Sequence, residues 1–249
     1  MERAKYSLIS LLLLFFLCSA LPAGYRTEIY SAYVNDRMDN WKTVIDRMQG
    51  ISGKSDDLIL ELVNYQYGYI GYCIGNDKKS EARKYLDLAQ KNIDLLETRK
   101  YNLSMVNAYN AAFCGFRIGM NVLTAPINGV RSMEYAKKAL ELDDENYLGY
   151  IQYGNIQFYM PKSFGGSKQE GIKYFLKARE ILEKDSSNLK ENWNYLSLLV
   201  VTGQSYYYIN DYESARNIYE NILKIEPEFT YVKDELYPQL LNKMNIVNN

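Results

Sequence analysis

Histidine is absent from this chain of 249 residues. This absence removes the side chain that serves most often as a general base and as a metal ligand. Functions that depend on histidine are therefore excluded, whereas chemistry based on carboxylates is not. The sequence also contains no P-loop, no nucleophile elbow and no metal-ligand spacing. We therefore expect a protein that is not an enzyme, with no catalytic residues, no metal site and no cofactor.

An excess of either charge is also lacking. The chain has 29 Lys and Arg against 30 Asp and Glu, which gives a formal net charge of −1. Proteins that bind nucleic acid carry a basic patch or stripe, and no basic cluster stands out here. Nucleic acid is therefore not an expected partner.

Cysteine is scarce, with three residues in the whole chain. Two of them, Cys73 and Cys114, follow the leader described below and lie near the ends of predicted helices. Export of the protein permits a disulfide between them. Single buried thiols are the alternative that we favour, since small apolar helix positions often hold free cysteine. Two cysteines are too few for a zinc site made of cysteine alone.

Long hydrophobic runs are absent except at the start of the chain. The segment Leu8–Leu17 is apolar apart from Ser10, follows a short charged start, and precedes small residues that end at Ala23. This pattern predicts a cleaved secretory signal peptide over residues 1–23, and the run is too short to span a bilayer. We therefore expect an exported protein, periplasmic or secreted, that does not span a membrane.

Two details of the leader stay open. Cleavage after Ala23 is preferred because Leu21-Pro22-Ala23 precedes it, and cleavage after Ala20 is the second choice. An outer-membrane lipoprotein acylated at Cys18 is disfavoured, because Leu17 is too bulky for the usual lipobox.

After the leader, apolar residues recur with a helical period nearly throughout, and no window alternates like a strand. We predict an all-α protein with a single domain over residues 24–249. Five helix pairs and a capping helix are expected, at about residues 27–49, 55–100, 102–142, 145–185, 190–225 and 228–244. Pro238 should bend the capping helix or set its start.

Two connections are longer than the period requires. They cover residues 124–129 and 161–166, and each should join the first and second helices of one pair. Ser167 and Glu170 then form a predicted capping box at the start of the next helix. Gly165-Gly166 before that helix offers backbone amides to an anion, although simple turn geometry is the alternative reading.

One stretch carries a recognisable spacing. Leu199, Gly203, Tyr206, Ala215, Tyr219 and Pro227 match the pattern W-x2-L-G-x2-Y, then A-x3-F, then P, which repeats about every 34 residues in tetratricopeptide repeat (TPR) proteins. Gly203 and Ala215 lack bulk, so two antiparallel helices can approach closely there. A lone pair of this kind cannot bury its apolar face, so the motif implies a stack of pairs.

The chain resembles the TPR superfamily over its whole length after the leader, most strongly in this last repeat. Ala136-x2-Ala139-Leu140-Glu141-Leu142-Asp143, Tyr153-Gly154 and Pro161-x2-Phe164-Gly165-Gly166 are similar to a group of exported bacterial TPR proteins with an F-G-G loop. The layout is also distantly similar to the periplasmic TPR component associated with TRAP-type transporters. The resemblance implies a right-handed solenoid, no catalytic residues, and binding through a concave groove.

Tyrosine is the compositional oddity, with 25 residues, all but Tyr6 after the leader. Neighbouring tyrosines cannot all face one side of a helix, so part of each cluster should reach the groove. Core packing with scattered exposure is the alternative reading. The candidate partner-binding residues are Tyr65, Tyr69, Tyr72, Tyr150, Tyr153, Pro161, Phe164, Gly165, Gly166 and Tyr207.

These observations predict a non-catalytic scaffold or adaptor that binds a protein or peptide in an open concave groove. The alternative is a solute-binding accessory of a transport system, with a small ligand near residues 124–129 and 161–166. An enzyme that uses carboxylates on the helical scaffold is a third reading, and no acid pair is singled out by its spacing to support it.

Overall fold

The structure is a computed structural model that describes residues 24–248; the predicted leader, residues 1–23, lies outside the described residues. Over the described range the regular structure is helical and contains no strand. The first three pairs are α2 (Tyr25–Val34) and α3 (Met38–Gln49), α4 (Asp56–Gly75) and α5 (Lys79–Thr98), and α6 (Leu103–Met120) and α7 (Ala125–Leu142). The next two are α8 (Tyr147–Tyr159) and α9 (Lys168–Glu183), and α10 (Trp193–Tyr208) and α11 (Tyr212–Ile225).

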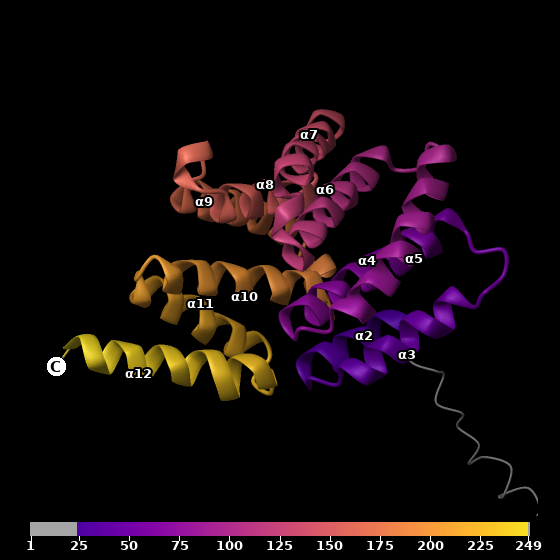
Figure 1. Cartoon of the computed structure of the whole chain (residues 1–249). Coiled ribbons are helices and arrows are strands. Elements are labelled where there is room, and N and C mark those ends of the chain that lie inside the picture. The colour runs from indigo at the N-terminus through magenta and orange to yellow at the C-terminus, as the bar shows by residue number, and fades with distance from the viewer. Residues whose placement is uncertain (1–23, 249) are drawn as a thin grey trace, which may run out of the picture.

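Consecutive helices pack as pairs, and each pair packs against the next pair along the chain (Figure 1). Glycines allow the close approach within two of these pairs. A Cβ on Gly203 of α10 would lie 2.4 Å from a ring carbon of Tyr219 in α11, and a Cβ on Gly154 of α8 would lie 2.5 Å from the Phe175 ring in α9. In the last pair, the small residue Gly203 and the large residue Tyr219 therefore contact each other, as the repeat spacing predicts.

The first pair also packs against the fifth. The rings of Trp41 in α3 and Trp193 in α10 are 4.9 Å apart, and Tyr33 of α2 lies 6.0 Å from Trp193. Tyr33 also lies 5.0 Å from Phe229, which follows α11. The two ends of the array are thus joined by buried aromatic side chains.

Aromatic packing continues between α4, α6 and α10. Tyr67 of α4 lies 5.4 Å from Phe116 of α6 and 6.2 Å from Trp193 of α10. The faces of α4, α6 and α10 that carry these side chains therefore meet through large aromatic rings. The three helices lie near the centre of the molecule in Figure 1. Between these three helices the structure therefore has an aromatic core, and the predicted concave groove stays a prediction.

The connections correct two sequence predictions. The residues 124–129 are not a loop, because a short 3₁₀ turn η1 (Val122–Thr124) leads directly into α7, with Pro126 in its first turn, where proline is favoured. The predicted capping box at Ser167 is half formed. Ser167 Oγ accepts the Glu170 N–H at 3.2 Å, but the Glu170 carboxylate pairs with Lys173 instead.

The C-terminal helix begins with a distortion. A π-helical segment η4 (Tyr231–Leu236) precedes α12 (Tyr237–Asn248), in which Pro238 is the second residue. Proline lacks an N–H and its ring collides with the carbonyl four residues earlier in a regular helix. The wider π turn removes that collision, so the expected disturbance at Pro238 takes this form.

Candidate functional site

Several aromatic side chains gather where α8 and α10 end. The aromatic surface consists of Phe158, Tyr159, Tyr207 and Tyr208, together with Phe164, which is exposed on the connection between α8 and α9. The Phe158 ring lies 5.2 Å from Tyr159 and 6.4 Å from Tyr208, and Tyr208 lies 6.0 Å from Tyr207. Tyr159, Phe164 and Tyr208 are 69 %, 77 % and 58 % exposed. Contiguous exposed apolar patches with a polar rim are typical of interaction sites, so we take this surface as a candidate.

The glycines of the α8–α9 connection determine its shape. η2 (Lys162–Phe164) is followed by Gly165 at φ +94°, a left-handed conformation that favours glycine. A Cβ on Gly166 would lie 1.9 Å from the Met160 carbonyl oxygen, so only glycine fits there. The connection is thus folded back on the end of α8, where the Ser167 N–H donates to the Gln157 carbonyl at 2.9 Å. Phe164 is left exposed at its tip.

Positive charge borders the aromatic surface. The ammonium group of Lys168 lies over the Phe158 ring, 5.4 Å from its centroid, and Lys162 is exposed in η2. The Tyr159 hydroxyl is protonated at neutral pH, because a tyrosine side chain ordinarily loses its proton only near pH 10. The surface therefore combines apolar rings, neutral hydroxyls and cations.

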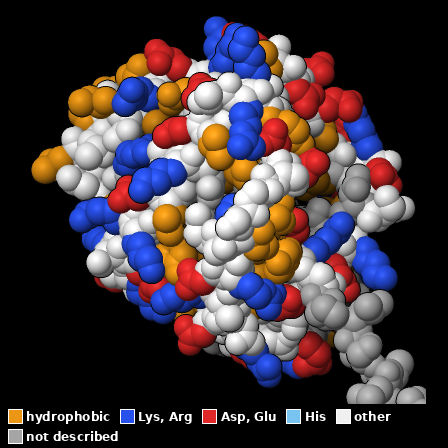
Figure 2. All heavy atoms as spheres, turned by 90° about the vertical axis from the view of Figure 1, so that its right-hand side faces the viewer, with side chains coloured by type: hydrophobic (Ala, Val, Ile, Leu, Met, Phe, Trp, Pro, Cys, Tyr) orange, Lys and Arg blue, Asp and Glu red, His pale blue; other side chains and the backbone are white. Residues whose placement is uncertain are grey.

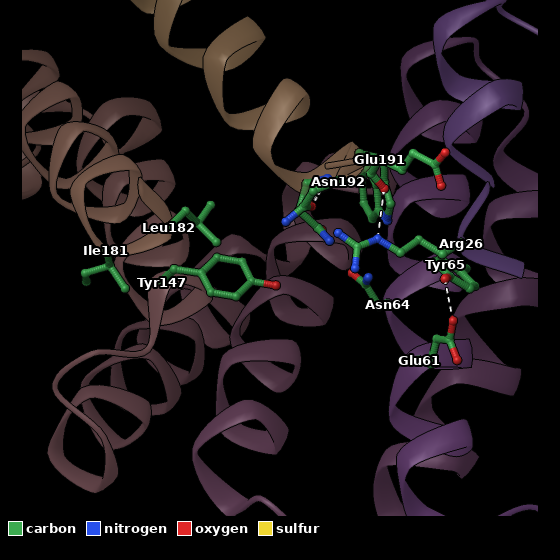
Figure 3. Close-up of a pocket in the computed structure, with 11 residues that line it drawn as sticks. Arg26, Glu61, Asn64, Tyr65, Tyr147, Ile181, Leu182, Glu191 and Asn192 are labelled. Carbon is green, nitrogen blue, oxygen red and sulfur yellow. Dashed lines mark hydrogen bonds between the residues drawn. The ribbon is translucent and has the colours of Figure 1, made fainter. Parts of the chain in front are cut away.

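A second feature is a cavity of about 440 Å³, which we call the interhelical cavity (Figure 3). It lies between α2, α4, the start of α8, the end of α9 and the start of α10. Its lining residues are Arg26, Glu61, Asn64, Tyr65, Tyr147, Ile181, Leu182, Glu191, Asn192, Trp193 and Asn194. In Figure 3 the Tyr147 hydroxyl points across the cavity toward Arg26 and Asn64.

The charged groups of this cavity already have protein partners. The Arg26 guanidinium donates to the Glu191 carbonyl at 3.2 Å and to the Lys190 carbonyl. The Tyr65 hydroxyl donates to the Glu61 carboxylate at 2.5 Å, and burial together with this bond raises the pKa of Tyr65. Burial also raises the pKa of Tyr147 to about 12, so its hydroxyl remains a donor at neutral pH.

The structure brings some of the sequence-predicted residues together and separates others. Pro161, Phe164, Gly165, Gly166 and Tyr207 belong to the aromatic surface or its supporting connection. Tyr65 and Tyr69 are buried, in contrast to the expected exposure, and their hydroxyls donate to Glu61 and Glu81. A role of these two residues in partner binding would therefore require access to the interior.

The other three predicted tyrosines are half-buried against neighbouring helices. Tyr72 lies 5.9 Å from Tyr69 and carries the Lys78 ammonium over its ring. Tyr150 and Tyr153 pack at 6.3 Å and 5.0 Å on Tyr174 of α9. Their contribution to a partner site stays a prediction.

Sequence reasoning did not select four residues that these two sites depend on, Tyr159, Tyr208, Asn64 and Trp193. For Tyr159 the available signal was its position directly before the proline-containing connection. No sequence signal marked Asn64 and Trp193, because their proximity follows from the contact between the two ends of the array.

Both described cysteines are buried and free, so they form no disulfide. Burial raises the pKa of Cys73 to about 11 and also raises that of Cys114. Within residues 24–248 no cluster of three or more cysteine or acidic side chains is arranged to hold a metal ion. The same range contains no helix with the length and apolarity that crossing a membrane requires.

The face seen in Figure 2 carries basic and acidic side chains interspersed with small hydrophobic patches. No area of a single sign dominates this face. The exclusion of nucleic acid from the partners nevertheless stays a prediction.

Comparisons with known proteins identify the fold but no family. No protein-family model matches the chain, and no curated protein matches its sequence. The solved structure of the HusA haemophore from Porphyromonas gingivalis is similar, with a TM-score of 0.58 over 76 % of this chain and 94 % of that chain. Sequence identity between the two is 17 %. The chain therefore shares the all-helical fold of that protein, and the TPR assignment stays a prediction.

Proposed function

We propose that this chain is an exported, non-catalytic binding protein whose ligand is a planar tetrapyrrole of the haem class, held on the aromatic surface. The observation that carries the proposal is the group of exposed rings at Tyr159, Phe164 and Tyr208. The similar fold of a protein named as a haemophore supports the same ligand class. This function is related to the solute-binding alternative from the sequence, which placed a small ligand near residues 124–129 and 161–166; only the second of these segments belongs to the aromatic surface.

The chemistry of the surface suits such a ligand. A tetrapyrrole presents a flat apolar ring that stacks on aromatic side chains, an arrangement that adds specific attraction to the burial of apolar area. Its carboxylate groups need cations at the edge of that ring, and Lys162 and Lys168 supply them. Phe164 and Tyr208 contribute the most exposed ring area of the α8–α9 connection and of α10 respectively.

Stacking, and not iron ligation, is the proposed basis of binding. Haem iron in proteins is held by His, Cys, Met or Tyr, and this chain has no histidine. Tyr159 is a poor ligand, because iron binds the phenolate and a tyrosine hydroxyl keeps its proton at neutral pH. A tetrapyrrole without iron should therefore bind about as tightly as haem.

The test is a titration of residues 24–249 with haem and with metal-free protoporphyrin, followed by absorbance. We expect saturable binding of both. Phe164→Ala and Tyr208→Ala should each weaken binding by about tenfold, the equivalent of one lost ring contact. The matched control is Leu123→Ala, an exposed apolar side chain of η1 outside the aromatic surface. Equal binding by all four proteins would contradict the proposal.

A protein partner is the second candidate function, and one observation favours it. The start of α7 and the preceding η1 expose Val122, Leu123, Ile127 and Val130, an apolar tip in an otherwise charged exterior. A scaffold or adaptor would use this tip in place of the predicted groove. Crosslinking from a cysteine introduced at Leu123, with a second at exposed Glu97 as control, should then capture one specific envelope protein. Identical crosslinking patterns from both positions would argue against this function.

A further inference from the structure

Two buried polar atoms have no hydrogen-bond partner and belong to residues that line the interhelical cavity. They are the indole Nε1 of Trp193 and the side-chain Oδ1 of Asn64. Only one other buried side-chain atom in the described part of the chain, Arg216 Nε, shares this condition. A buried donor or acceptor without a partner costs about 1–3 kcal/mol. The cavity thus concentrates an uncompensated donor and an uncompensated acceptor from helices far apart in the sequence.

The indole of Trp193 is fixed in place by its packing. Trp193 is only 4 % exposed, and its ring packs on Trp41 at 4.9 Å. The far edge of its six-membered ring lies against Gly68, where an added Cβ would come within 2.7 Å of that edge. Trp193 also lines the cavity, and its Nε1 is carried on the ring edge opposite the one that meets Gly68.

The rest of the lining defines the chemistry of a ligand. Asn64 and the carboxylates of Glu61 and Glu191 accept hydrogen bonds, whereas the indole and the Tyr147 hydroxyl donate them. The lining carries both signs of charge, one cation from Arg26 and two carboxylates from Glu61 and Glu191. The charge of the lining therefore does not select an anionic or a cationic ligand. Aromatic faces beside amides and carboxylates suit a molecule with many hydroxyl groups and apolar C–H faces.

We propose that the interhelical cavity binds a neutral carbohydrate of one or two sugar rings. Its hydroxyl groups accept from Trp193 Nε1 and donate to Asn64 Oδ1, which gives both atoms their missing partners. The cavity volume of about 440 Å³ lies within the range of small-molecule sites. Ile181 and Leu182 supply the apolar part of the wall.

This site is independent of the tetrapyrrole proposal. Trp193 begins α10 and Tyr208 ends it, so the two sites are separated by about 22 Å of helix. Along α8, Tyr147 and Tyr159 are likewise about 18 Å apart. A substitution at one site should leave the other unchanged, and failure of one proposal does not entail failure of the other.

The experiment measures binding of glucose and maltose to residues 24–249 by tryptophan fluorescence and by the shift in melting temperature. Glucuronate and glucosamine serve as charged probes of the same shape. We expect a saturable response to a neutral sugar, which Trp193→Phe and Asn64→Leu each weaken by at least about tenfold. Phe164→Ala, which lies on the aromatic surface, is the control and should bind the sugar as the unmodified protein does.

Trp193→Phe keeps the aromatic packing, so the variant should fold, and its far-UV circular dichroism checks this. Because both variants remove an unpartnered atom, they should also melt at or above the temperature of the unmodified protein when no sugar is present. A response to neither neutral sugar would overturn the proposal. So would tighter binding of either charged probe, or sugar binding that Trp193→Phe and Asn64→Leu leave unchanged.

Discussion

At the scale of single residues, the abundance of tyrosine is explained by its apolar ring, which packs in the core, and its hydroxyl group, which donates a hydrogen bond. Tyr85 buries its ring in the core while its hydroxyl donates to Asp46 at 2.7 Å. Tyr195 does the same toward Glu183 at 2.5 Å, and Tyr30 toward Glu226 at 2.9 Å. Phenylalanine would fill the same space but remove the hydroxyl donor from each of these carboxylates. Many tyrosines therefore serve the fold, and the proposed function rests on the exposed ones on the aromatic surface.

A pH dependence follows from one of these carboxylates. Glu81 accepts from Lys42 at 2.6 Å and from the Tyr69 hydroxyl at 3.1 Å, and mainly the Lys42 bond holds its pKa below the ordinary value. A carboxyl with a lowered folded pKa stabilises the protein above its unfolded pKa of about 4.3, and this stabilisation is lost as the pH falls through the lower folded value. Glu81→Gln should therefore destabilise the protein at pH 7, and the difference should shrink below about pH 4.

Urea unfolding of both proteins between pH 7 and pH 3 measures this difference. Glu97→Gln, at an exposed position of the same helix α5, is the control and should show little difference at any pH. A Glu81→Gln difference that stays constant across the range would contradict the assigned pKa shift.

At the scale of elements, the sequence predicts the helical class and the positions of the helices, because the helical period is a local property. It also predicts the meeting of Gly203 with Tyr219, since both lie within one pair. It does not predict that α10 packs against α2 and α3, because periodicity identifies a buried face but not the helix that covers it. The local Gly165-Gly166 pair marked Phe164 as a candidate residue. No local pattern marked Trp193, because its place in the cavity depends on contacts between helices that are distant in the sequence.

The close approach within the fourth pair gives a second prediction. Gly154→Ala places a Cβ 2.5 Å from the Phe175 ring and 3.0 Å from the Gly171 carbonyl, so helix α8 or that ring must shift. We expect the free energy of unfolding to fall by about 1–3 kcal/mol, as measured by chemical denaturation. Gly115→Ala in α6 is the matched control, since nothing lies within 4 Å of its Cβ, and it should gain up to about 1 kcal/mol. Equal effects of the two substitutions would show that helix propensity, and not the contact, decides the outcome.

At the scale of the whole molecule, contact between the two ends makes the array one body. The buried residues form a continuous cluster that includes Ile29 near the start and Leu240 near the end. Arg26 of α2 bonds to the backbone just before α10, and the Tyr30 hydroxyl bonds to Glu226 after α11. An array of pairs joined only to their neighbours can unfold piecewise. The contacts between the two ends should make unfolding a single cooperative transition in place of piecewise unfolding.

Phe229 tests this joining. Its ring is fully buried and lies 5.0 Å from Tyr33. Phe229→Ala should lower the free energy of unfolding by about 3–5 kcal/mol, whereas Phe164→Ala, on the exposed surface, should change it by less than about 0.5 kcal/mol. In the unmodified protein, tryptophan fluorescence and circular dichroism should report the same single transition. Two separate transitions there would contradict the account of one body.

The central claim is that the aromatic surface binds a planar tetrapyrrole. Its most direct test is a map of backbone amide chemical shifts for residues 24–249, recorded as metal-free protoporphyrin is added. The account predicts that the shifts which change gather at residues 158–168 and 207–212, while those of the interhelical cavity at residues 61–65 and 192–194 stay in place. Changes centred on the cavity or on η1, or no saturable change at all, would contradict it.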